Sequence, residues 1–424
     1  ETMSLTAAVC DRARWPEDAE LITKGADLLI YFYELALTLI KRQTGRLVFL
    51  TQNSWLDTDY GKKFQLFLTR HTSVRSIVDS DFKYFDGTDG PNINTIISLF
   101  CGRVPRPQDK IVFARFHESF AASNISYDQL VDATVQPTVA HVRVYNHSDP
   151  LVQELKWGVL LTAQDDIFFQ VFAALEANAK RLSEANLGLT FGQGLNLSKA
   201  ALVSPEHFAG LGIREEHCLQ ILSSADGAPF AIRKTKYRII DEYLIDPKKA
   251  VQVRKASVEL FDSRRSRKTP PILIMPRGLG RHFCALAAPQ THSSSGVDIY
   301  DDSSSTDTET RLNLWLALNS SVCWLWREIC GRKNLGGGML KAEAVDLDPL
   351  PIYMDFNSPK EVRKIFESIS VRQALDSQKE IHTSEHHRID CIVSEYLGLT
   401  ASKAETIRQL LSSKIAERTQ KSRT

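Results

Sequence analysis

Arginine and lysine side chains gather in one stretch of this 424-residue chain, and their chemistry suits the binding of a polyanion. Residues 231–281 hold 14 Lys and Arg against 5 Asp and Glu, although the whole chain carries a net charge of only +1. The arginine fork matches the edge of guanine, and Lys or Arg on surrounding loops binds phosphate. A solvated basic surface is the alternative, because these side chains are mostly exposed in any protein. The candidates for DNA contacts are Arg233, Lys234, Lys236, Arg238, Arg264, Arg265, Arg267, Lys268, Arg277 and Arg281.

Other patterns that could carry chemistry are weak. Residues 191–194 read Phe-Gly-Gln-Gly, but no long helix follows directly, so they indicate a turn in a mixed sheet rather than a cofactor loop. His386-His387 and Asp301-Asp302 lack companion ligands, so we predict no metal site. The seven cysteines form no Cys-x-x-Cys pair, which favours reduced thiols. The sequence also contains no Pro-Asp…Asp/Glu-x-Lys nuclease core.

The elements that must position such residues change character along the chain. Within residues 27–100 the sequence alternates between helix and strand patterns. Helices are expected at 28–40 and 60–71, and strands at 47–50, 74–78 and 94–100. The run at 47–50 is continuously apolar, as in a central strand of a parallel sheet. These are too few strands for a complete doubly wound sheet, so they predict half of one.

The remaining residues predict a mixed region and a helical tail. We expect short strands at 111–150, helices within 149–182, a buried strand at 270–280, an exposed loop or weak hairpin at 291–310 and one apolar helix at 311–329. Amphipathic helices follow from Ser358, which is expected to cap the first of them. The hydrophobic fraction of 43% indicates a globular protein. Because no run reaches about 18 apolar residues and no signal peptide is apparent, we expect no membrane segment and a cytoplasmic location.

Several stretches resemble, in the same order, the adenine-specific DNA methyltransferases of the TaqI-like and type IIG restriction–modification kind. Trp157-Gly158 is similar to a Lys-Trp-Gly that precedes the specificity domain of these enzymes. Residues 318–340, LNSSVCWLWREICGRKNLGGGML, carry the most specific resemblance, to a Leu-Asn-Ser…Leu-Gly-Gly-Gly-x-Leu pattern. Further similar stretches lie at 187–196, 271–283 and 388–400.

The resemblance implies a domain plan and an activity. Residues 1–115 would be the second half of a Rossmann-like methyltransferase sheet of α/β class. Residues 116–355 would form an α+β target-recognition domain and residues 356–424 a helical C-terminal region. The implied reaction is methyl transfer from S-adenosylmethionine to the exocyclic amine of adenine in double-stranded DNA, within a restriction–modification or defence system.

Two aromatic residues acquire roles through the resemblance. A base must leave the duplex stack to be methylated, and flat side chains then hold it. Phe85 stands where the family places the aromatic residue that stacks on the flipped adenine; closing the sheet edge is its alternative role. Phe32 matches an aromatic residue that contacts the cofactor, although Leu29 stands where the family has Tyr. Packing in the core is the alternative for Phe32.

Two family motifs are absent from this sequence, namely the Gly-rich cofactor loop and the Asn-Pro-Pro-Tyr/Phe tetrapeptide. Because the groups that bind the cofactor and grip the target amine are missing, we predict that this chain alone does not methylate DNA. The rival function is a non-catalytic DNA-binding specificity subunit or remnant that works with a separate catalytic or nuclease chain.

Overall fold

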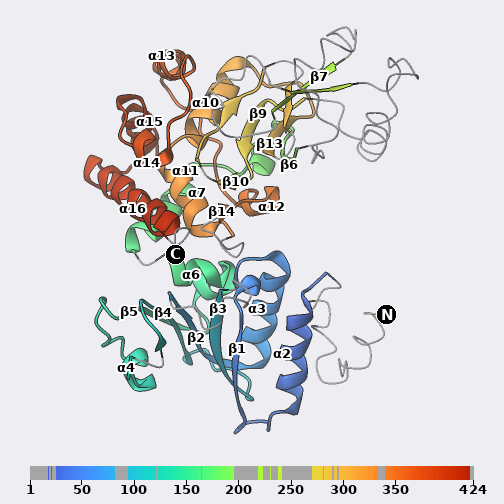
Figure 1. Cartoon of the computed structure of the whole chain (residues 1–424), viewed down its shortest axis with the longest axis vertical. Helices are drawn as coiled ribbons and strands as arrows, with labels where there is room; N and C mark the ends of the chain where they lie inside the picture. The colour runs from blue at the N-terminus through green and yellow to red at the C-terminus, as the bar shows by residue number, and fades with distance from the viewer. Residues whose placement is uncertain are drawn as a thin grey trace. The chain divides into compact units, whose positions relative to one another are not determined.

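A computed structural model describes the chain over residues 18, 21, 25–81, 94–120, 123–163, 165–194, 218–222, 230, 237–240, 270–279, 281–288, 291–293, 296–332 and 340–420. The chain is of mixed α/β class and divides into two compact units (Figure 1). The first unit comprises Glu1–Asp166 with Arg332–Gly336, and the second comprises Ile167–Gly331 with Gly337–Thr424. The functional boundaries at residues 115 and 355 stay predictions.

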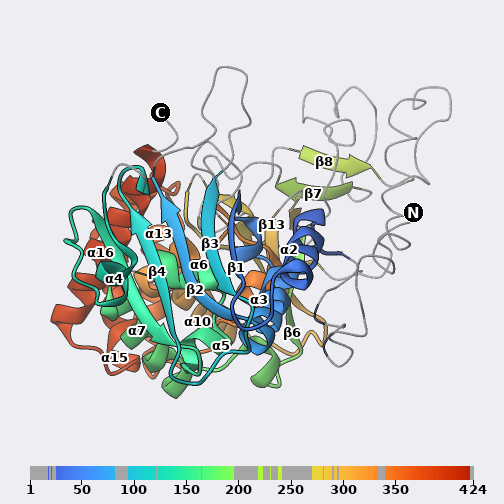
Figure 2. The ribbon, with the colours of Figure 1, turned by 90° about the horizontal axis from the view of Figure 1, so that it is seen from below.

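The first unit is built around a five-stranded sheet. Its strands are β1 (Arg46–Gln52), β2 (Ser73–Ser80), β3 (Thr95–Cys101), β4 (Lys110–Phe116) and β5 (Ala140–Asn146). They follow one another in the order β1-β3-β2-β4-β5, which can be traced in Figures 1 and 2. Strand β3 is antiparallel to both of its neighbours, β2 is parallel to β4, and β5 is antiparallel to β4. Strands β1, β2 and β4 therefore run in the same direction.

Helices cover one face of this sheet with an aromatic layer. They are α2 (Leu28–Leu39), α3 (Asp59–His71), α5 (Pro150–Glu154) and α6 (Trp157–Thr162), and a short 3₁₀ turn, η2, spans Ser54–Leu56. Tyr33 of α2 packs on Phe64 of α3, with ring centroids 5.4 Å apart. Trp157 of α6 contacts Trp55 and Phe113 at 5.8 and 5.7 Å. All five of these rings are at most 1% exposed, so they form the core of the unit.

The other face of the sheet is covered over only part of its width. Helix α4 (Tyr127–Val131) and the segments beside it pack Leu130 and neighbouring apolar residues on β2, β4 and β5. On β1, alternation turns Val48 and Leu50 to this face, where they are 62% and 42% exposed. An apolar strip of the sheet therefore remains open at the β1 edge.

The second unit contains small β-sheets, and most of its helices lie towards the C-terminus of the chain. Its main sheet has the order β11-β9-β13-β6, built from β6 (Leu189–Gln193), β9 (Leu273–Pro276), β11 (Ala285–Leu286) and β13 (Gly296–Asp301). The smaller sheets contain β7 (Cys218–Leu222), β8 (Tyr237–Ile240), β12 (Thr291–Ser293), β10 (Gly278–Leu279) and β14 (Leu340–Lys341). Its helical elements are α7 (Asp166–Asn178), η4 (Leu182–Glu184), α10 (Thr308–Leu318), α11 (Ser321–Cys330), α12 (Ala344–Leu347), α13 (Pro359–Ile369), α14 (Ser377–Glu380), α15 (Ser384–Tyr396) and α16 (Ala401–Gln420).

The expectation of one helix over 311–329 is wrong, because the chain breaks between α10 and α11. The side chain of Asn319 accepts from the backbone N–H of Cys284 (2.8 Å) and donates to the carbonyls of Cys284 (2.9 Å) and Trp315 (2.8 Å). Ser320 then caps α11 by accepting from the backbone N–H of Cys323. Both helices are buried, so the apolar sequence pattern continues through the break. The interruption is therefore not visible in the sequence.

The expectation of an exposed loop or weak hairpin over 291–310 is also wrong for its first half, where β12 pairs with β7. Strand β13 is buried and pairs with both β6 and β9. Its polar residues are satisfied internally, since Asp298 accepts hydrogen bonds from Ser293 (2.8 and 2.9 Å) and Tyr300 (3.2 Å). The composition therefore indicated that this segment is exposed to solvent, whereas the internal hydrogen bonds allow the polar residues of β13 to be buried.

Helix α13 begins at the residue expected from the sequence, but Ser358 makes no side-chain capping bond. Among the residues of the structure that are described, no helix is both long and apolar enough to cross a membrane.

Candidate functional site

The carboxyl ends of β1 and β2 lie at one end of the first sheet, the place where open α/β sheets bind ligands. Gln52, the last residue of β1, donates from Nε2 to Oδ2 of Asp27 (2.9 Å). Asp27 also caps α2, accepting from the backbone N–H of Leu29 at 3.0 Å. The N–H of Asn53 donates to the carbonyl of Asn94 (3.1 Å), just before β3. These contacts fix the start of α2 at the candidate site.

Phe32 lies on the outer side of α2, near this end of the sheet. It is 55% exposed, and Leu28 one turn earlier is 58% exposed, so the two form an apolar surface. The adjacent Tyr33 points inward and bonds to the hydroxyls of Thr51 and Ser98, each at 2.8 Å. Burial raises the pKa of Tyr33 despite these bonds. Phe32 is thus accessible to a ligand, and its role as cofactor contact stays a prediction.

Phe85 lies outside the described residues, as do all of 82–93. The two flanking residues are described. Asp81 directly follows the carboxyl end of β2, and Asn94 directly precedes β3. Asp81 accepts from Nη2 of Arg115 (2.9 Å) and lies 3.5 Å from Nδ1 of His117. The segment that carries Phe85 therefore starts and ends at the candidate site, and the stacking role of Phe85 stays a prediction.

Most of the predicted DNA contacts fall outside the described part of the chain. Arg238 lies in β8, opposite Gln220 of β7, where only the backbone is described. The residues not described are Arg233, Lys234, Lys236, Arg264, Arg265, Arg267 and Lys268. Their assignment to DNA stays a prediction.

Arg277 and Arg281 are engaged within the second unit. Arg277 donates from Nε and Nη2 to the carboxylate of Glu343, at 2.8 and 2.5 Å. Glu343 also accepts from Gln193 (2.8 Å) and pairs with Lys341 (2.6 Å). Burial opposes ionisation of Glu343, but the bonds from Arg277 and Lys341 outweigh it and lower the pKa of Glu343. Arg281 donates to the carbonyl of Ala374 (3.2 Å). A base contact by Arg277 would therefore require it to leave Glu343.

A Ser–His–Asp arrangement in the second unit escaped the sequence analysis. Oγ of Ser321 lies 2.9 Å from Nε2 of His386 and donates to Oδ2 of Asp390 (2.7 Å). All three are at most 3% exposed, and the backbone N–H of Ser321 also bonds Asp390 (2.7 Å). The serine donates to the aspartate and is closed to substrate, so the arrangement joins α11 to α15 and does not serve nucleophilic catalysis. No local signal marked it, because Ser321 lies 65 residues before His386 and 69 before Asp390.

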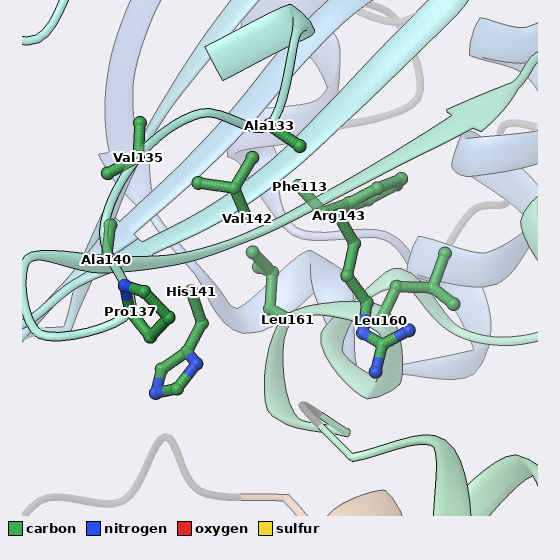
Figure 3. Close-up of a pocket in the computed structure, with 10 residues that line it drawn as sticks. All are labelled: Phe113, Ala133, Val135, Pro137, Ala140, His141, Val142, Arg143, Leu160 and Leu161. Atoms are coloured by element: carbon green, nitrogen blue, oxygen red, sulfur yellow. The ribbon is translucent and has the colours of Figure 1, made fainter. Parts of the chain in front are cut away.

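A cavity of about 240 Å³ lies between β5, the turn before it and α6 (Figure 3). Apolar residues such as Leu160, Leu161 and Val142 line it together with His141 and Arg143, and Arg143 pairs with Asp166 (3.0 Å). It is smaller than the roughly 300–1,000 Å³ usual for ligand sites. Within the described ranges, no group of three or more metal-ligating side chains occurs.

One protein-family model matches part of the first unit. Residues 17–85 match the family described as Eco57I restriction-modification methylase. The match therefore spans α2, β1, α3 and β2, the elements that surround the candidate site. None of the curated proteins compared with the chain matches it.

The solved structures that are similar to this chain include two restriction–modification enzymes. One is the type IIL restriction-modification enzyme MmeI in complex with DNA, with a TM-score of 0.55 and 12% identity, covering 96% of this chain and 55% of MmeI. The other is the type IIG restriction endonuclease BpuSI, with a TM-score of 0.45 and 13% identity, covering 93% of this chain and 50% of BpuSI. At such low identity the likeness to MmeI concerns the fold, and this chain spans about half the length of either enzyme.

Proposed function

We propose that this chain is the C-terminal portion of an S-adenosylmethionine-dependent, adenine-specific DNA methyltransferase of a restriction–modification or defence system. The observation that carries the proposal is the coincidence of the methylase match at 17–85 with the elements that hold Phe32 and with β2, which leads into the Phe85 segment. Residues 1–115 would complete the Rossmann-like catalytic sheet, 116–355 would recognise the target and 356–424 would support them. The implied location is the cytoplasm.

The open strip on β1 supports a catalytic half that continues beyond this edge. Strand β1 pairs only with β3 in the described sheet, and Val48 and Leu50 lie exposed opposite Leu99 and Ile97. Sheets with parallel strands in α/β domains are covered on both faces. Another strand and its helix would remove this apolar surface from water, whether they belong to the same polypeptide or to a separate catalytic chain.

Within that assembly the residues of this chain would hold and orient the reactants. The exposed ring of Phe32 fits an apolar contact to S-adenosylmethionine, which supplies the methyl group when bound. Phe85 would stack on the extruded adenine, and the basic stretch at 231–281 would hold the DNA phosphates. None of these steps requires a metal ligand from this chain.

Methyl transfer tests the catalytic part of the proposal. Labelled S-adenosylmethionine and mixed-sequence duplex DNA are incubated with the chain alone, and with a polypeptide that carries the Gly-rich loop and the Asn-Pro-Pro-Tyr/Phe tetrapeptide from the same reading frame or a neighbouring gene. We expect N6-methyladenine only in the mixture. Transfer by the chain alone would show that its predicted inactivity is wrong, and methylcytosine in the mixture would contradict adenine specificity.

DNA binding tests the recognition part, and it also separates the enzyme from the specificity-subunit alternative. Reversing the charges of Arg264, Arg265, Arg267 and Lys268 should weaken binding to all duplex sequences about equally and lower the salt slope by roughly 3 to 4. The matched control reverses four exposed charges elsewhere in the second unit, namely Lys360, Arg363, Lys364 and Lys403. Equal losses in both variants, or binding that does not change with salt, would contradict the assignment. Sequence-specific binding, with methylation only when the catalytic motifs are supplied by a chain from a separate gene, would favour the specificity subunit.

A further inference from the structure

A second cavity, of about 500 Å³, lies in the first unit at the opposite end of the sheet from the candidate site. Its lining includes Arg46 at the start of β1, Arg75 at the start of β2, Cys101 at the end of β3 and Tyr127 of α4. The volume lies within the range of small-molecule sites. No part of the proposed methyl transfer uses this cavity.

The cavity carries positive charge that the protein does not neutralise. Arg103, also in the lining, is held by Asp109 through two bonds of 2.6 and 2.8 Å, and this pairing keeps the pKa of Asp109 well below its usual range. Among the described residues, no ion pair joins Arg46 or Arg75 to a carboxylate. Two guanidinium groups therefore face a space lined by no acidic residue.

The backbone around the cavity is shaped to present these arginines. Arg75 is the extra residue of a β-bulge, since Val74 pairs with Phe100 and Ser76 with Leu99. Bulges re-aim a side chain and are frequent beside functional sites. The Tyr127 hydroxyl donates to the carbonyl of Arg75 (3.3 Å), and the Arg75 guanidinium lies 5.7 Å from the centre of the Tyr127 ring.

The turn on the other side of the cavity is also unusual. Gln43 has a φ of 73°, in the left-handed region that glycine favours. Its N–H donates to the carbonyl of Gly102 (3.1 Å), whose own N–H donates to the carbonyl of Gly45 (2.9 Å). A strained residue persists only where its surroundings fix it, and such residues cluster at ligand sites. The turn therefore holds Gln43 and Thr44 rigidly at the cavity rim.

We propose that this pocket binds a small phosphorylated molecule, with its phosphate held between Arg46 and Arg75. The planar arginine fork pairs with phosphate through two parallel hydrogen bonds, which a single charge on a flexible chain does not provide. The Tyr127 ring fixes one face of Arg75, so that guanidinium loses little freedom on binding. The site lies at the amino ends of β1 and β2, whereas the candidate methylation site lies at their carboxyl ends.

Calorimetric titration with inorganic pyrophosphate and with ADP tests the proposal. We expect binding of at least one probe, with affinity reduced at least tenfold in the double variant Arg46→Gln/Arg75→Gln. The control, Arg42→Gln/Arg106→Gln, removes two exposed charges outside the lining and should bind as the parent does. Hydrogen exchange confirms that each variant is folded, and it should show protection of residues 43–46 and 73–76 on binding.

The outcomes distinguish the sources of phosphate. Absence of binding by both probes, or equal affinity in the double variant, overturns the proposal. If neither probe binds while duplex DNA affinity falls in the double variant alone, the arginines contact a nucleic-acid backbone and the small-molecule site is wrong. Methylation by the assembled enzyme should not change in the double variant, so failure of this site and failure of the proposed function give different results.

Discussion

The two units are stabilised by different interactions. In the first, the core is a layer of aromatic rings between α2, α3, α6 and the sheet, held by apolar burial. In the second, charged groups are buried between helices: Glu328 of α11 is 1% exposed and bonds Arg418 of α16 and His282. Buried charges require precise partners, whereas apolar contacts tolerate variation. The second unit should therefore respond more sharply to single substitutions and to acid.

The largest expected effect is at Glu328. Its carboxylate takes hydrogen bonds from Nε2 of His282 (2.6 Å) and Nη2 of Arg418 (2.8 Å). In Glu328→Gln, Arg418 loses the buried carboxylate that it bonds, which should lower the free energy of unfolding of the second unit by about 3–5 kcal/mol. Denaturant titration followed by hydrogen exchange of peptides from each unit measures the change.

The control for this substitution is Glu361→Gln, which removes a pair with Arg388 at the surface of the same unit. Solvent and salt screen such pairs, so little change is expected. If the two substitutions had equal effects, the buried pair would not distinguish the units and the comparison would be wrong.

Acid should destabilise the second unit through the same cluster. Burial lowers the pKa of His282 to about 4, since Arg327 and Arg418 add positive charge and Glu328 only partly compensates. Between about pH 6.5 and 4, His282 is therefore protonated in the unfolded chain but neutral in the folded unit. The free energy of unfolding falls as pH drops from about 6.5 to about 4, by up to ~1.4 kcal/mol per pH unit.

Glu328 extends this loss to lower pH. Burial opposes its ionisation, but the bonds from His282 and Arg418 lower its pKa to about 2, so its stabilisation disappears as pH falls from about 4.5 towards that value. Thermal melting of the parent and of His282→Gln between pH 7 and 4 measures the first step. The variant should show a flatter profile, and identical profiles would mean that His282 is not the group that titrates.

A smaller effect is expected in the first unit, at Gly158. A Cβ there would lie 1.7 Å from Oδ1 of Asp57, while the adjacent Trp157 donates its backbone N–H to Gln65 (3.1 Å). Gly158→Ala should therefore lower the free energy of unfolding of the first unit by about 1–3 kcal/mol. Gly25→Ala is the control, since nothing lies within 4 Å of a Cβ there. Equal melting temperatures for both variants would show that the Trp-Gly pair is not closely packed.

The sequence could predict features that depend on neighbouring residues, but not features that depend on pairing between distant ones. The helix at 28–40 and the strand at 47–50 were confirmed as Leu28–Leu39 and Arg46–Gln52, because apolar periodicity and glycine turns are local signals. The expectation of a central strand in a parallel sheet was wrong for β1, which lies at the edge of the described sheet and pairs antiparallel with β3. The insertion of β3 between β1 and β2, and the buried β13, depend on pairing between distant residues that no local pattern records.

The candidate site was predictable to a similar extent. The family resemblance directed attention to Phe32, but α2 is apolar on nearly every side, so the sequence could not tell that Phe32 points outward while Tyr33 points inward. The pairing of Arg277 with Glu343 spans 66 residues, and nothing near Arg277 in the sequence indicated that its fork is occupied.

The smallest expected effect is at Tyr33, one of the few hydrogen-bonding groups in the aromatic layer. Its hydroxyl bonds Thr51 and Ser98, and Ser98 also reaches the carbonyl of Phe49 (3.4 Å). Tyr33→Phe should cost about 1 kcal/mol, because Thr51 loses a buried partner while the ring packing remains. Adding Thr51→Val and Ser98→Ala should recover most of that loss, since a polar group removed together with its partners leaves nothing unsatisfied. Hydrogen exchange of α2 and β1 measures both variants. A loss in Tyr33→Phe as large as that in Glu328→Gln, without recovery in the triple variant, would mean that polar contacts hold the first unit as well.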